Sequence, residues 1–267
     1  MSDNLAIAAE HLAARRYRLA TQFAGYVLAQ EPDESEALEI LGVACLQRGE
    51  FEDGIEALEQ LSWLRPLPHE LQVELAIAYG AVGSHRLSRD LLMNLATTCE
   101  LDAKCLLRVA AGLEAVDRPR LAMEACRRAG RLAPDTAEVH YQMGYYAQVC
   151  GHPSSVSEAL LRHAIDLDPR NLHFRIGLAS LLLRLGRKCE AVMVIDPFIP
   201  SRLDEVTCEC CLKRIANLFF DCDDLERARL CAARLAELRP KIQRDRSRNS
   251  RWIGRPLDRD FSRTATR

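Results

Sequence analysis

The chain of 267 residues is 48% hydrophobic and contains only 13 glycines, which excludes disorder over most of its length and allows one continuous core. Its formal net charge is −2, but this charge is unevenly distributed. Residues 1–240 hold 27 basic and 35 acidic residues, a net of −8, whereas residues 241–267 hold nine basic and three acidic residues, a net of +6. An acidic body with a basic tail predicts that the tail meets an anionic surface.

Helices are predicted in pairs, most clearly in residues 35–68. Apolar and small residues in the first half recur at spacings of three and four, the period of one helix face. This stripe consists of Leu38, Leu41, Gly42 and Cys45. A second apolar stripe consists of Ile55, Leu58 and Leu61. Gly49 is predicted to end the first helix and Pro66 the second, because neither residue favours a continuing helix.

The same pattern recurs along the chain with a period of about 34 residues. Counted in order, the units are residues 1–34, 35–68, 69–102, 103–136, 137–171, 172–208 and 209–240. Such self-similarity is typical of helical repeat proteins, since one helix pair cannot bury both of its apolar faces alone.

Three columns of residues recur in register across these units. In the first helices a large residue precedes a small one: Ile7-Ala8, Leu41-Gly42, Leu75-Ala76, Val109-Ala110, Met143-Gly144, Leu178-Ala179 and Ile215-Ala216. The second helices carry another small column: Ala20, Gly54, Ser88, Ala122, Ser157, Ala191 and Ala228. Turn glycines recur at Gly49, Gly83, Gly151 and Gly186. The small columns predict that the two helices of a pair approach closely.

These columns resemble the tetratricopeptide repeat family over residues 1–240. The resemblance implies an all-α, right-handed solenoid of about seven repeats and 14 helices, followed by a flexible Arg-rich tail at residues 241–267. The chain departs from the family pattern at Glu100, where a proline is usual, and lacks the tryptophan favoured in the first helix. The family resemblance also implies a non-enzymatic scaffold or adaptor that binds a peptide or helix of a partner protein on its concave face.

In this family the concave surface is lined by about the second, fifth, ninth, twelfth and thirteenth residues of each first helix. Along the middle of the array this places the following residues in the groove: Val43, Leu46, Val73, Ile77, Ala81, Leu107, Ala111, Tyr141, Tyr145, Val149, Ile176 and Leu183. This mostly apolar set predicts an amphipathic or apolar partner segment. Tyr141 and Tyr145 are the predicted anchors, because large aromatic residues dominate binding energy at such surfaces.

The basic tail supports an alternative function, as an adaptor for nucleic acid or another anionic surface. Its predicted contact residues are Arg248, Arg251, Trp252 and Arg255. Arginines can neutralise phosphates while an aromatic ring stacks on bases. The same segment could instead dock weakly on the acidic body.

The eleven cysteines are spread over the repeats without a shared spacing, which favours free thiols in a reducing compartment. No leader sequence and no run of about 18 apolar residues is evident, so a cytoplasmic protein without a membrane span is predicted. Five cysteines gather in the last repeat: Cys208, Cys210, Cys211, Cys222 and Cys231. Three of them fall within four residues of one predicted helix and should point in different directions, so no metal is predicted.

No motif for catalysis or cofactor binding is present in the sequence. Phosphate loops, nucleophile elbows and zinc-protease pairs are all missing, and the seven histidines occupy unrelated repeat positions. Residues 221–224, Asp-Cys-Asp-Asp, lack the glycine and glutamate of a calcium loop. Asp223 and Glu226 are instead predicted to cap a helix. The sequence therefore predicts neither an enzyme nor a cofactor.

Overall fold

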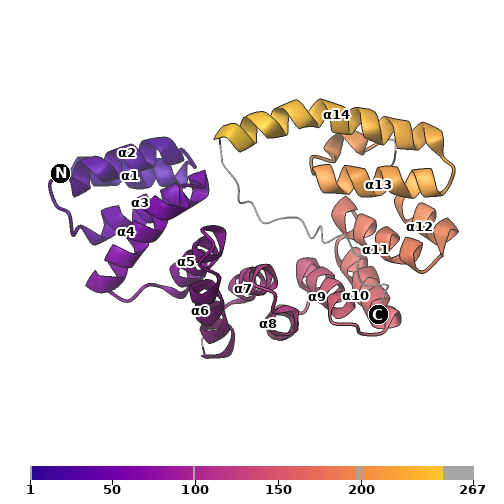
Figure 1. Ribbon diagram of the computed structural model, residues 1–267, viewed down its shortest axis with the longest axis horizontal. Coiled ribbons are helices and arrows are strands. Elements are labelled where there is room, and N and C mark those ends of the chain that lie inside the picture. Colours follow the sequence, from indigo (N-terminus) through magenta and orange to yellow (C-terminus); the bar gives the residue numbers. More distant parts are fainter. Residues whose placement is uncertain (1, 99, 197–198, 200, 249–267) are drawn as a thin grey trace. The chain divides into compact units, whose positions relative to one another are not determined.

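The computed structural model describes residues 2–98, 100–196, 199 and 201–248. The regular structure in these residues is helical, with fourteen α-helices and no strand. Figure 1 shows them following one another as antiparallel pairs. The chain divides into two compact units, one built around Met1–Asp135 and the other around Thr136–Gln148 and His152–Asp245.

The first unit holds four helix pairs. Their bounds are α1 Ser2–Ala13, α2 Tyr17–Leu28, α3 Ser35–Arg48, α4 Phe51–Leu64, α5 His69–Ala81, α6 His85–Thr98, α7 Ala103–Ala115 and α8 Pro119–Leu132. Each helix contacts its partner in the pair, and the second helix of one pair contacts the first helix of the next. This arrangement lets each pair cover the apolar face of its neighbour.

The second unit holds three pairs. Its helices are α9 Ala137–Val149, α10 Ser154–Leu167, α11 Leu172–Arg184, α12 Lys188–Ile195, α13 Glu209–Asp221 and α14 Leu225–Arg248, with a short 3-10 helix, η2, at Leu203–Glu205. Helix α12 is shorter than the others, because Pro197 and Pro200 follow it in the sequence. Each of the predicted repeats two to seven begins at the first residue of a helix in the structure.

The turn within each helix pair contains one residue with a left-handed backbone conformation, and this is always the fifteenth residue of the repeat. The four predicted glycines occupy it in four pairs, with φ between 75° and 86°. In the other three pairs it is occupied by Arg15, Asp117 and Asp223, with φ of 56°, 61° and 59°. The pairing of the helices therefore requires this conformation even where the residue has a side chain that disfavours it.

Small residues bring the two helices of a pair together, as predicted. In the pair α3 and α4, a Cβ added at Gly42 would lie 2.7 Å from Leu58 Cδ2, and one added at Gly54 would lie 2.5 Å from Leu46 Cδ2. The small residues of the second helices are buried in the first six repeats. In the last repeat Ala216 and Ala228 are only half-buried.

The helix caps correct one prediction from the sequence. Asp224, and not Asp223, caps α14, because its Oδ1 accepts a hydrogen bond from the backbone N–H of Arg227 at 3.1 Å. Asp223 occupies the left-handed turn position instead. Helix α14 continues through Pro240 to Arg248, so the predicted basic tail begins within this helix.

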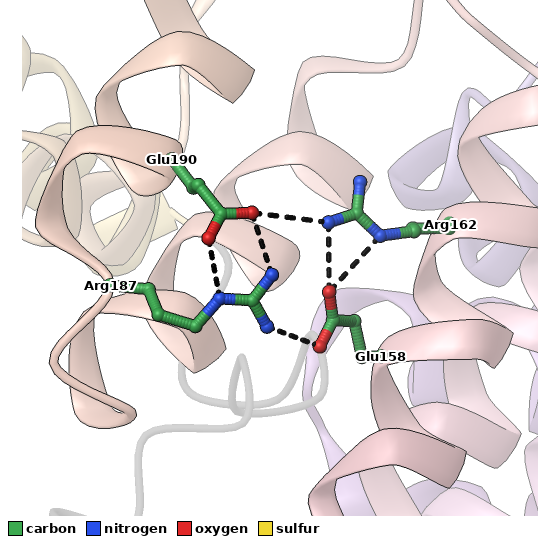
Figure 2. Close-up of polar contacts among 4 residues, drawn as sticks. All are labelled: Glu158, Arg162, Arg187 and Glu190. Atoms are coloured by element: carbon green, nitrogen blue, oxygen red, sulfur yellow. Dashed lines mark hydrogen bonds and ion pairs between the residues drawn. The ribbon is translucent and has the colours of Figure 1, made fainter.

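A group of four charged residues joins the second helices of repeats five and six. Figure 2 shows Glu158 of α10 between Arg162 and Arg187, with Nη1 of Arg187 donating at 2.6 Å to Glu158. Arg187 also donates to both oxygens of Glu190, each at 2.6 Å. Glu158 accepts hydrogen bonds from both Arg187 and Arg162. These bonds, with the larger effect from Arg187, lower the pKa of Glu158. The group links α10 to α12, so its role is structural.

Candidate protein-binding groove and cysteine cluster

An open groove of about 640 Å³ lies at the first two repeats. It is formed by the C-terminal half of α1, the start of α3 and the residue that follows α4. The lining residues are Ala9, Leu12, Ala13, Glu34, Ser35, Glu36, Glu39, Ile40 and Arg65. Figure 1 shows α1 and α3 near the N-terminus of the chain.

Most of this lining occupies the repeat positions expected on a concave face. Ala9, Leu12 and Ala13 are the ninth, twelfth and thirteenth residues of the first repeat. Glu36 and Glu39 are the second and fifth residues of the second repeat. None of the predicted groove residues, which come from the middle of the array, lines this groove.

The groove is lined by both apolar and acidic side chains. Ala9, Leu12, Ala13 and Ile40 contribute apolar side chains. Three glutamates are set against Arg65, whose guanidinium pairs with Glu39. The surrounding chain has the same sign, since residues 1–68 hold 12 acidic and 5 basic residues, a net of −7. Residues 1–68 thus account for most of the net negative charge of residues 1–240.

The structure places several predicted groove residues in the interior. Val73 is fully buried, and Ile176 and Tyr141 are 2% and 3% exposed. The Tyr141 ring lies 5.0 Å from the Phe174 ring, and a Cβ added at Gly177 would come within 2.6 Å of it. Burial raises the pKa of Tyr141. The prediction that these three side chains face a partner is wrong, because the first helix of a neighbouring repeat covers this face.

The remaining predicted groove residues are covered to different degrees. Leu46 and Tyr145 are buried, whereas Ala111 is exposed. The half-buried members are Val43, Ile77, Ala81, Leu107, Val149 and Leu183. The predicted tail contacts Arg251, Trp252 and Arg255 lie outside the described residues. Arg248 is the last residue of α14, and its side chain lies outside the described part.

Three cysteine thiols gather at the start of α13. The Sγ atoms of Cys208, Cys210 and Cys211 all lie within 4.8 Å of one another. Cys208 precedes the helix, with extended backbone angles of φ −86° and ψ 120°, so its side chain turns back toward the first turn. The sequence-based expectation that the three thiols point apart is therefore wrong. Cys222 and Cys231 are not part of the cluster.

A histidine from a neighbouring repeat reaches the same cluster. His173 Nδ1 of α11 lies 3.3 Å from Cys211 Sγ. The His173 backbone is held by Asn171, whose side chain accepts a hydrogen bond from the His173 N–H at 3.1 Å. The pKa of the His173 side chain is lowered, mainly by burial.

The thiols are coupled to one another. Hydrogen bonds from Cys210 and Cys211 lower the pKa of Cys208, while hydrogen bonds to its neighbours raise the pKa of Cys211. The same hydrogen bonds therefore move the pKa values of Cys208 and Cys211 in opposite directions.

The fold defined by these helix pairs is that of tetratricopeptide repeat proteins. A scan against protein-family models finds no match, and a search of curated proteins finds none either. A solved tetratricopeptide repeat protein from Parabacteroides merdae matches 91% of this chain and 96% of its own, with a TM-score of 0.72 and 12% identity.

Other solved structures give the same result over shorter stretches. PilF of Pseudomonas aeruginosa matches 79% of this chain and 97% of its own, with a TM-score of 0.59 and 19% identity. A structure of MamA from MSR-1 matches 61% of this chain and 93% of its own, with a TM-score of 0.51 and 23% identity. These likenesses confirm the predicted tetratricopeptide-type fold. None of the described helices is long and apolar enough to cross a membrane.

Proposed function

We propose that this protein is a non-enzymatic scaffold that binds a segment of a partner protein in the groove between α1 and α3. The observation that carries the proposal is the groove itself, an open hollow lined by apolar and acidic side chains. Tetratricopeptide-type repeats present extended concave surfaces of this kind for binding. The repeats, which account for nearly all the described residues, supply the surface and its rigidity.

The chemistry of the groove selects the partner class. The apolar lining residues suit the apolar face of a helix or an extended apolar stretch. Glu34, Glu36 and Glu39 outnumber Arg65 in the lining, which favours a segment carrying Lys or Arg beside its apolar residues. The partner is therefore an amphipathic segment with a basic edge.

A charge reversal with a matched control tests this function. Glu36→Lys changes an exposed residue of the groove, and Glu56→Lys makes the same change at an exposed residue of α4 outside it. Proteins retained by the wild-type chain from its native lysate are identified, and their affinity for each variant is measured. Glu36→Lys should weaken binding by about tenfold or more, which is the size of a hot-spot loss of about 1.4 kcal/mol. Glu56→Lys should bind as the wild type does.

Photo-crosslinking locates the contact independently of affinity. A photoreactive residue at Ala13, which is exposed in the groove, should form a covalent adduct with the same partner, whereas one at Glu56 should not. Equal retention by both lysine variants, or an adduct at Glu56 with none at Ala13, would contradict the groove as the binding site. The alternative, nucleic-acid binding through the tail, has no supporting observation in the described residues.

A further inference from the structure

Three cysteine thiols, Cys208, Cys210 and Cys211, gather within the reach of one metal ion, and His173 approaches them through Cys211. With metal–sulfur bonds of about 2.3 Å and a metal–nitrogen bond of about 2.05 Å, two sulfurs lie about 3.8 Å apart and a sulfur and a nitrogen about 3.6 Å apart. Cys210 Sγ and Cys211 Sγ are 4.0 Å apart, and His173 Nδ1 is 3.3 Å from Cys211 Sγ. Cys208 Sγ and Cys210 Sγ, at 2.6 Å, must separate by about 1.2 Å to fit.

We propose that Cys208, Cys210, Cys211 and His173 bind one zinc ion as a structural site. Three sulfurs and one imidazole nitrogen form a donor set that zinc favours, and four protein ligands leave no open position for catalysis. Cys210 and Cys211 are buried, while Cys208 and His173 are half-buried, so an ion can enter from the side of the latter two. Binding displaces the three thiol protons to solvent.

The position of the site explains what the ion does for the fold. Consecutive pairs elsewhere are joined by four to six residues, but 13 residues separate α12 from α13. This junction contains the short 3-10 helix η2. Leu203 and Val206 pack into the core of the second unit. An ion held by α11 and the start of α13 would fasten the last repeat to the sixth across this long junction.

The charges around the site are compatible with a bound cation. Three thiolates and a neutral imidazole around Zn²⁺ give a net charge of −1. Cys210 and Cys211 also lie in the first turn of α13, where the helix dipole stabilises negative charge.

The test uses the full-length protein, purified under reducing conditions without chelator. Zinc per chain is measured by mass spectrometry of the metal, and the metal-free protein is titrated with Co²⁺. One zinc per chain and the visible absorption bands of tetrahedral cobalt–thiolate coordination are expected. Cys208→Ser and His173→Ala should each weaken zinc binding by at least about 100-fold, since even the loss of an outer-shell partner costs about 10- to 100-fold.

Cysteines outside the cluster provide the matched controls. Cys189→Ser, at an exposed position of α12, and Cys222→Ser, at the far end of α13, should keep both the zinc and the cobalt spectrum. Circular dichroism distinguishes the loss of a ligand from the loss of the fold. Cys208→Ser should disturb the fold least, because Cys208 is only half-buried. Reduced wild-type protein without zinc and without a cobalt–thiolate spectrum would overturn the proposal. Formation of a Cys208–Cys210 disulfide in the presence of zinc would also overturn it.

Discussion

The same substitution should have opposite effects at two helical glycines. Gly25 of α2 is exposed, and an added Cβ would meet nothing within 4 Å. Gly54 of α4 is buried, and an added Cβ would lie 2.5 Å from Leu46 Cδ2, 2.8 Å from Leu46 Cγ and 3.2 Å from the Gly42 carbonyl oxygen. Gly25→Ala and Gly54→Ala therefore make the same chemical change against different surroundings.

The magnitudes follow from two competing effects. Replacing a helical glycine by alanine stabilises a helix by about 0.8–1 kcal/mol, and Gly25→Ala should gain this amount in full. At Gly54 the buried Leu46 and the Gly42 backbone must both move, and such overpacking costs about 1–3 kcal/mol. The net change for Gly54→Ala is a loss of up to about 2 kcal/mol, so the two variants should differ by about 1–3 kcal/mol.

Urea unfolding followed by far-ultraviolet circular dichroism measures this difference. Gly25→Ala should shift the midpoint upward and Gly54→Ala should shift it downward, with the slope unchanged. If Gly54→Ala is as stable as Gly25→Ala, the close approach of α3 and α4 is not what requires a small residue there.

Three further predictions concern the turns, the interior and the charged group. Arg15→Gly should stabilise the protein by about 0.5–1 kcal/mol, because glycine removes left-handed strain, whereas Gly49→Ala should destabilise it by about 1 kcal/mol; thermal melting of both variants is the check. Tyr141→Ala should lower the free energy of unfolding by about 3–5 kcal/mol, as expected of a buried aromatic, and a near-wild-type melt would show that its side chain is not in the core. Glu158 has a lowered pKa, so its contribution is present above about pH 4.3 and is lost as pH falls below that value. Glu158→Gln should therefore flatten the loss of stability in acid, and unchanged acid curves would contradict the ion group of Figure 2.

The sequence by itself determined the repeats and most of their boundaries. The period of about 34 residues and the alternating apolar stripes predicted the helix pairs. Six of the counted repeats begin at the first residue of a helix. These features are local: a stripe repeats every three or four residues, and a glycine marks a left-handed turn because it has no side chain to clash.

Tertiary packing decided which faces stay open. Tyr141 and Ala13 both occupy positions assigned to the concave face, yet Tyr141 is buried and Ala13 is exposed in the groove. The difference arises because a helix from the next repeat covers Tyr141 through Phe174 and Gly177. A period gives the direction of a side chain around its own helix, but it does not state how closely the neighbouring helix approaches.

The cysteine cluster was decided in the same way. The spacing of Cys208, Cys210 and Cys211 suggests divergent side chains if all three are helical. In the structure Cys208 lies before the helix and turns toward the other two cysteines. His173, which precedes Cys211 by 38 residues in the sequence, contacts Cys211 from α11. One residue at a helix boundary and one contact between repeats brought the four groups together, and neither is encoded in the local pattern.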